Sequence, residues 1–275
     1  MAKESKFQEK WRLFLDSFRL KSSFLYVILY DLLFYVITIP LFILFPWLLN
    51  KKLAGIDPEI LSRITSTALT NITAAQTKEL EMAVQSMQNF FAFFIIGIIF
   101  LAIASLLVFT LSRALIWNFL LKKKFEKKSY FKFNVLNVLL AVIFAVIIFI
   151  LARLRTLIVM PLVSASVLFA FIVTSLLFLL IFVAIIYFVN LVYLNYTEKS
   201  NVLGSFGATF ELIKNRFLDI YPSYLFMVMV SIVISLVAQI FWLFPFAIQR
   251  YFNFAVFILF AAWMRIYILR VIKNE

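Results

Sequence analysis

The chain has no cysteine, no histidine and only four glycines among its 275 residues. Without cysteine, disulfides, thiolate metal sites and cysteine nucleophiles are excluded. Without histidine, the commonest general base and the commonest metal ligand are missing. Because glycine is scarce, there is little material for phosphate-cradling loops or unwound helices. The acidic residues lie mostly in loops, and no carboxylate pair stands out. We therefore expect no catalytic residue, no metal site, no cofactor, and a protein that is not an enzyme.

Apolar residues, by contrast, are in large excess. The chain is 65% hydrophobic, contains 35 phenylalanines and has a mean hydropathy of +1.06. Soluble domains are about 45–50% apolar, so this chain needs a bilayer as its solvent. The net charge of +13 then indicates basic residues that flank membrane spans, and no nucleic-acid partner is expected. Residues 1–23 carry many charges and no apolar core segment, so we expect no cleavable signal peptide.

Six apolar segments are long enough to cross a membrane as helices, which takes about 20 residues each. The runs are continuous rather than alternating, which excludes barrel strands. The apolar run at 157–194 is too short for two spans, and Pro161 is predicted to separate a short outer segment from its single span. The predicted fold is all-α: a polytopic transmembrane helix bundle forming one integral membrane domain over residues 1–275. The predicted spans lie near 24–49, 89–121, 133–152, 165–193, 223–245 and 254–272.

Lysine and arginine predict the orientation of these spans. With the N-terminus in the cytoplasm, 18 basic residues fall on the inner side and 7 on the outer side, with Arg113 left inside the second span. Cytoplasmic loops carry the excess of basic residues. We therefore predict a multi-pass protein of the cell membrane with both termini cytoplasmic.

The segment 50–88 is predicted to be a helical outer loop. Its "DPEI" at 57–60 has aspartate as a helix cap and proline at the first helical position. Apolar residues then recur at helical spacing from Leu80 to Phe91, into the second span. Asn71 begins the glycosylation sequon "NIT" on the predicted outer side; such tripeptides are common by chance, and its use is left open.

Two amphipathic helices are predicted on the cytoplasmic face, in residues 1–23 and 200–222. In the first, aromatic residues recur at steps of four, three and four; in the second, a stripe with the same steps superposes on it at an offset of 199 residues. Such stripes beside a membrane are typical of helices lying in the interface, although both could instead extend their spans into the cytoplasm. Internal duplication is left open. The stripes comprise Phe7, Trp11, Phe14, Phe18 and Phe206, Phe210, Ile213, Phe217.

The basic run "KKKFEKKSYFK" at 122–132 follows the second span. A basic run beside a membrane suits anionic headgroups, and it also serves as a topology signal. We therefore expect membrane lipids as partners, with anionic headgroups at the cytoplasmic face, and we leave open a protein partner or a homo-oligomer.

The segments "FQEKWRLFLDSF" (7–18) and "SFGATFELIKNRFL" (205–218) each lead into a span. This layout resembles a broad class of uncharacterised six-span archaeal and bacterial membrane proteins, which includes relatives of the membrane domain attached to some glycerophosphodiester phosphodiesterases. The resemblance implies a six-span membrane protein. In that family, the catalytic residues belong to a separate soluble barrel domain. No such domain is recognisable in these residues, so no catalytic residue carries over.

A few polar residues interrupt the apolar spans near their predicted cytoplasmic ends. Asp31 and Arg265 each lie seven residues from that end, roughly 10 Å deep, and Arg113 lies eight residues from it, roughly 12 Å deep, at 1.5 Å per residue. Asn190 and Asn118 share this zone. Ionisable residues inside a membrane are candidates for function. These five residues form the candidate intramembrane polar cluster.

Two interpretations of the cluster stay open. Asp31 could pair with Arg113 or Arg265 and fix helix packing, or the cluster could line a cytoplasm-facing cavity that binds an ion, a lipid headgroup or a substrate. Both arginines could also snorkel to the interface. We expect a non-enzymatic multi-pass protein with a structural, lipid-interacting or partner-binding role. The alternative is a transporter or permease subunit that uses this polar site.

Overall fold

The structure, a computed structural model, describes residues 6–19, 22–54 and 74–273, which are almost entirely helical. Six helices within these ranges are long and apolar enough to cross a membrane, so the predicted all-α, six-span fold is confirmed. The long helices are α2 (Ser22–Leu53), α4 (Ala74–Leu120), α5 (Lys127–Ala165), α6 (Val167–Lys199), α8 (Phe217–Ile240) and α9 (Phe246–Lys273). The shorter ones are α1 (Lys6–Ser17), α7 (Val202–Asn215) and the 3-10 turn η1 (Phe241–Leu243).

Helix α4 is the longest element, with 47 residues. It begins at Ala74, so the helical spacing from Leu80 to Phe91 does continue into the second span, as predicted. Helix α2 remains unbroken although Pro40 and Pro46 lie inside it. Membrane-spanning helices often tolerate internal prolines. The "DPEI" segment and the Asn71 sequon fall outside the described residues.

The break predicted at Pro161 is wrong. Helix α5 continues through this residue to Ala165, and the chain changes helix at Ser166. Ser166 adopts an extended backbone, with φ −167° and ψ 125°, and its hydroxyl accepts a hydrogen bond from the Phe169 backbone N–H at 3.4 Å. A proline removes only one backbone hydrogen-bond donor, whereas a capping serine stabilises the start of a new helix. The boundary between α5 and α6 therefore lies at Ser166.

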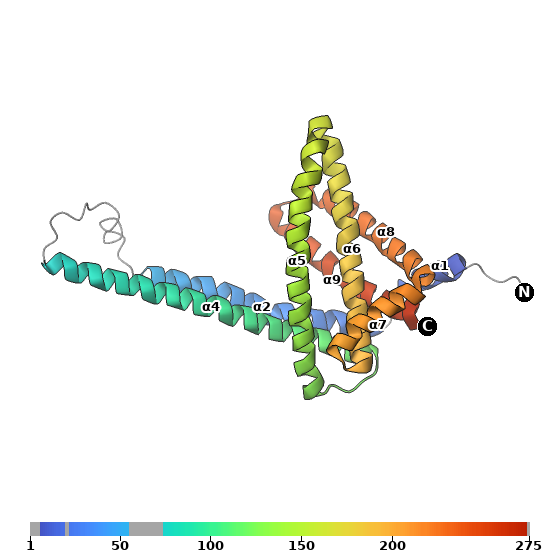
Figure 1. The fold of residues 1–275 in the computed structure, drawn as a ribbon, viewed down its shortest axis with the longest axis horizontal. Helices are drawn as coiled ribbons and strands as arrows, with labels where there is room; N and C mark the ends of the chain where they lie inside the picture. The colour runs from blue at the N-terminus through green and yellow to red at the C-terminus, as the bar shows by residue number, and fades with distance from the viewer. Residues whose placement is uncertain (1–5, 20–21, 55–73, 274–275) are drawn as a thin grey trace, which may run out of the picture. The chain divides into compact units, whose positions relative to one another are not determined.

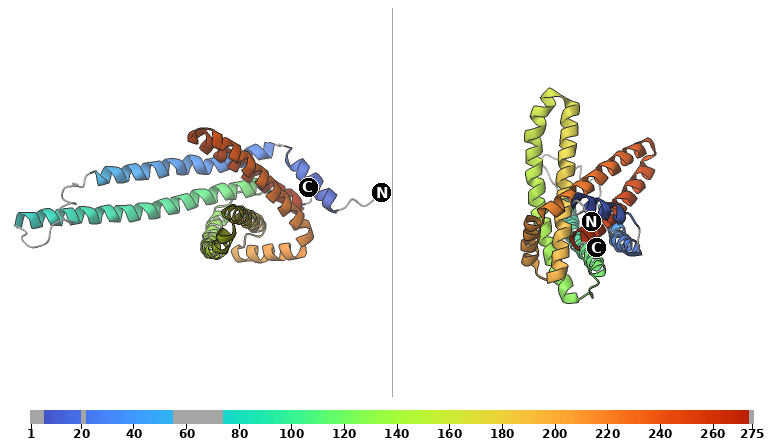
Figure 2. Two further views of the ribbon diagram at one scale, coloured as in Figure 1. Left: turned by 90° about the horizontal axis from the view of Figure 1, so that it is seen from above. Right: turned by 90° about the vertical axis from the view of Figure 1, so that its right-hand side faces the viewer.

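The chain forms two compact units. Unit 2 covers residues 32–109, and unit 1 covers residues 1–31 and 110–275. Within unit 2, the antiparallel helices α2 and α4 lie side by side (Figures 1 and 2). The Phe45 ring of α2 lies directly against Gly97 of α4, so this glycine allows a close helix approach. Both units contain spanning helices, and the single membrane domain stays a prediction.

Unit 1 contains α1, residues 22–31 of α2, residues 110–120 of α4 and all of α5 to α9. Figure 1 shows α5 beside α6, and the views in Figure 2 agree. We define the basic end of the spans as the end where residues 22, 120, 127, 199, 217 and 273 lie. The core sits at this end: buried residues of α5 fall at 133–140, those of α8 at 220–231 and those of α9 at 258–271. In α6 they fall at 183–197, with Ala170 as the exception.

Helices α1 and α7 form in both predicted amphipathic segments, and each packs on neighbouring spans. Phe14 of α1 is buried and stacks on Phe226 of α8, with ring centroids 4.9 Å apart. The indole Nε1 of Trp263 in α9 donates to the Ser17 hydroxyl at 2.8 Å. In α7, a buried hydroxyl accepts from α6, described below. Location in the membrane interface stays a prediction for both helices.

Candidate functional site

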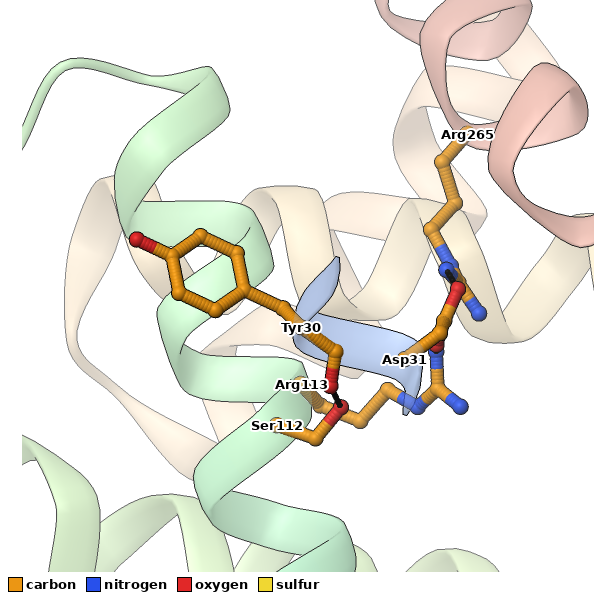
Figure 3. A network of polar contacts seen from close by, with 5 residues as sticks. All are labelled: Tyr30, Asp31, Ser112, Arg113 and Arg265. Carbon is orange, nitrogen blue, oxygen red and sulfur yellow. Dashed lines mark hydrogen bonds and ion pairs between the residues drawn. The ribbon is translucent and has the colours of Figure 1, made fainter. Parts of the chain in front are cut away.

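One buried carboxylate binds two buried guanidinium groups at the basic end of unit 1. Asp31 comes from α2, Arg113 from α4 and Arg265 from α9 (Figure 3). Arg113 Nη1 donates to Asp31 Oδ1 at 2.6 Å, and Arg265 Nη1 donates to Asp31 Oδ2. Each carboxylate oxygen therefore has its own arginine. We call these three residues the trio. The sequence left open which arginine pairs with Asp31, and the structure pairs it with both.

Local packing positions the trio. The Ser112 hydroxyl donates to the backbone carbonyl of Tyr30 at 2.7 Å, which aligns α4 with α2 one residue before each charged partner (Figure 3). A small cluster of buried apolar residues lies within one helical turn of the charges. It is formed by Val27, Ile116, Ala262 and Ile266. The apolar residues of this cluster come from the same three helices that supply the charges of the trio.

The trio carries an excess of positive charge. Among the residues whose burial the structure describes, Asp31, Arg113 and Arg265 are the only buried charged side chains. Removing a charge from water costs several kcal/mol, and a partner offsets this cost only with good hydrogen-bond geometry. Two guanidinium groups share a single carboxylate here, so the trio has a formal charge of +1. Its side chains are 3%, 9% and 8% exposed for Asp31, Arg113 and Arg265.

The two asparagines of the predicted cluster do not join the trio. The side-chain nitrogen of Asn190 donates to the Ile186 carbonyl of its own helix at 2.8 Å. Asn118 is half-buried on α4, and its backbone carbonyl accepts from the Lys123 backbone N–H at 2.8 Å. In the described part of the chain, neither asparagine side chain hydrogen-bonds to a trio member. Similar depth therefore did not imply a shared site, because each residue projects from its own side of a helix.

Sequence reasoning missed a second buried network. Tyr193 of α6 donates its hydroxyl to Asn137 Oδ1 of α5 at 2.6 Å. Asn137 Nδ2 donates in turn to the Thr110 hydroxyl of α4 at 2.8 Å. Thr110 lies about one helical turn from Arg113, so α4 connects this network to the trio. The available signal was an isolated asparagine in the apolar run "LNVLL", at 136–140.

Polar contacts also attach the basic loop and α7 to α6. Lys123 Nζ donates to the backbone carbonyls of Thr197 and Glu198, at 2.6 Å and 2.9 Å. These carbonyls lie in the last turn of α6, where a cation is favourable. Asn195 Nδ2 donates to the Thr209 hydroxyl at 2.9 Å, which attaches α7 to α6. The basic loop therefore lies beside the C-terminal end of α6, at the basic end of the spans.

The chemistry available to the trio is electrostatic. It offers guanidinium N–H donors and a carboxylate already engaged by two cations. The described residues contain no group of three or more acidic side chains placed so that they could hold a metal ion. The arrangement can hold three helices together, and it can attract negative charge.

No protein-family model matches the chain, and neither the curated proteins nor the solved structures searched give a match. The resemblance to relatives of the glycerophosphodiester phosphodiesterase membrane domain therefore stays a prediction. The following proposals depend on the geometry of the chain itself.

Proposed function

We propose that the chain is a non-enzymatic multi-pass membrane protein with a structural, lipid-interacting or partner-binding role, in which the trio assembles the spans. Its six long apolar helices are those of a multi-pass membrane protein. The trio joins α2, α4 and α9, and the Thr110–Asn137–Tyr193 network joins α4, α5 and α6. These two networks thus connect five of the six candidate spans, and the Tyr224 hydroxyl of the sixth, α8, donates to the Leu180 carbonyl of α6 at 2.8 Å.

The single observation that carries this proposal is that the Asp31 carboxylate is fully engaged. Both of its oxygens bind arginine, and a cluster of buried apolar residues lies within one helical turn of it. A carboxylate that served a transported cation would need an oxygen available for that cation. Removing one partner of a buried ion pair leaves an uncompensated charge, so such pairs enforce one arrangement of their helices.

The alternative role, a transporter or permease subunit, has less support. Transporters of several folds bind their substrates where spans are broken in the middle of the membrane. Each of the six candidate spans is a continuous helix over its described residues. The trio lies near one end of its spans rather than halfway along them, which also favours assembly over transport.

Orientation and partners complete the proposal. We propose that the basic end faces the cytoplasm of the cell, because basic residues are concentrated there. Exposed Lys122 and Lys124 at this end would meet anionic headgroups. The same experiment tests for a protein partner and for a second copy of the chain.

The experiment is purification of the full-length protein from its native membrane in a mild detergent, followed by mass spectrometry of co-purifying lipids and polypeptides. A multi-pass protein of similar size, purified in parallel, is the control for adventitious lipid. Retention of a defined lipid class or polypeptide at fixed stoichiometry supports the proposal. Accumulation of a solute by sealed vesicles containing the purified chain, and not by empty vesicles, would instead show a transporter.

A further inference from the structure

The buried charge of the trio is not balanced. One carboxylate serves two guanidinium groups, and no other buried acidic side chain occurs among the residues whose burial is described. Lone buried charges are costly, and two like charges on one carboxylate also repel each other. A monovalent anion beside the arginines would bring the site to neutrality. The protein supplies no such anion from its described buried residues, so it would come from outside.

Donors for such an anion are present. A guanidinium carries five N–H groups in a fixed fork, and Arg265 gives one of its nitrogens, Nη1, to Asp31. Its side chain is 8% exposed. One helical turn from Arg113, Trp117 is fully buried, and its Nε1–H has no hydrogen-bond partner. An indole N–H can only donate a hydrogen bond, so the partner that it needs is an acceptor, such as an oxygen of an anion.

These donors continue toward the basic loop. Arg113 and Trp117 lie four residues apart on one face of α4, and Lys124 lies in the loop that follows the end of this helix at Leu120. Trp117 packs in one cluster with Leu269, which lies one turn beyond Arg265 on α9. Arg113, Trp117 and Arg265 therefore lie on neighbouring helices, and exposed lysines follow the end of α4. An anion approaching from the basic end would meet the positive charge of these lysines first.

We propose that Arg113 and Arg265, with Asp31 as an internal competitor, form a binding site for a phosphate-type anion, either free phosphate or the phosphate of an anionic lipid headgroup. The planar fork of a guanidinium matches the oxygens of a phosphate, which favours this anion over a simple halide. The proposal deepens the proposed function, because it assigns a ligand to the assembly trio. The bound anion would neutralise the excess positive charge of the trio.

The charge count predicts an ordered series of variants. Arg265→Gln reduces the trio from +1 to 0, and binding of the anion should weaken by roughly tenfold or more, the loss expected for a charged hydrogen bond. Asp31→Asn raises the charge to +2 and removes the competitor, so binding should tighten. The double variant Asp31→Asn/Arg265→Gln restores +1 on Arg113 alone, and its affinity should lie between these two.

The test uses full-length protein in nanodiscs of phosphatidylcholine. Thermal unfolding is measured with inorganic phosphate and with sodium chloride at equal ionic strength. In a second arm, the discs contain phosphatidylglycerol, and native mass spectrometry counts the anionic lipids retained. A phosphate response without anionic lipid identifies a free anion as the ligand, whereas a response to phosphatidylglycerol alone identifies the headgroup.

The matched control is Lys122→Gln/Lys124→Gln, which removes the same kind of charge from the exposed loop. Because exposed lysines attract the anion through charge that salt screens, we expect this variant to weaken binding less than Arg265→Gln does and to reduce the dependence of binding on salt. Loss of the response in this control, with Arg265→Gln unchanged, would show that surface lysines bind the anion and overturn the proposal. The proposal is also overturned if phosphate and phosphatidylglycerol stabilise the wild-type protein no more than chloride does. This comparison needs no variant, so it remains decisive if Arg265→Gln does not fold. The proposed assembly role fails separately, if Asp31→Asn leaves unfolding unchanged.

Discussion

Asp31→Asn should destabilise the folded membrane protein more than any other single polar substitution in the trio. The substitution keeps the shape of the side chain but removes its charge. Two charge-assisted hydrogen bonds, to Arg113 and Arg265, are lost or weakened, each contributing about 1.5–3 kcal/mol. Two buried guanidinium groups are then left without a counter-charge.

Breaking a buried ion pair from one side costs about 3–5 kcal/mol, in agreement with the sum over two such bonds. At 1.4 kcal/mol per factor of ten, the ratio of unfolded to folded protein should rise by roughly two to four powers of ten. Arg265→Gln should cost less, because it leaves a neutral Asp31–Arg113 pair. The expected order of stability is therefore wild type, then Arg265→Gln, then Asp31→Asn.

The assay is equilibrium unfolding of the purified proteins in mixed detergent micelles, followed by tryptophan fluorescence, with the monodisperse yield as a second readout. Asp16→Asn is the matched control. Asp16 pairs with Arg19 at 3.4 Å on the surface of the protein, where an ion pair contributes at most about 1 kcal/mol. If Asp31→Asn and Asp16→Asn gave equal unfolding free energies, or if Arg265→Gln were the more damaging trio variant, the charge argument would be refuted.

Three further predictions concern the remaining architecture. Asn137→Ala should lower the free energy of unfolding by about 1–3 kcal/mol in the same assay, because it leaves the buried hydroxyls of Thr110 and Tyr193 without their partner. The control Asn134→Ala should change this free energy little, because the side-chain oxygen that it removes has no hydrogen-bond partner. Gly207→Ala should raise stability by about 0.5–1 kcal/mol, since the site in α7 is open and alanine favours a helix; a loss would mean that this face packs on something. A single cysteine at Thr73 should react with an impermeant maleimide from outside intact cells and one at Lys124 only after lysis; the reverse pattern would invert the topology.

The sequence by itself determined the helical class and the span count. A bilayer leaves helices and closed barrels as the only ways to satisfy backbone polar groups, and continuous apolar runs exclude barrels. The similar distance of Asp31, Arg113 and Arg265 from the ends of their helices was also readable, because a helix rises a fixed 1.5 Å per residue. Depth along a span follows from local geometry, which the sequence encodes directly.

Only the tertiary structure decided which side chains meet at that depth. It joined Asp31 to both arginines, left Asn118 and Asn190 outside the trio, and connected Thr110, Asn137 and Tyr193. The direction in which each helix face points depends on packing between helices. In a chain rich in phenylalanine and leucine, apolar surfaces occur on every side of each span, so they select no single rotation.

The same reason applies to the ends of the helices. Pro161 is a local signal for a helix break, but α5 continues through it. The side chain of Ser166 accepts the hydrogen bond that caps the start of α6. Trp263 and Ser17 meet across 246 residues, a contact that no local pattern predicts. The sequence thus determined which segments form long apolar helices and where each charge lies along them, and helix packing decided which charges became partners.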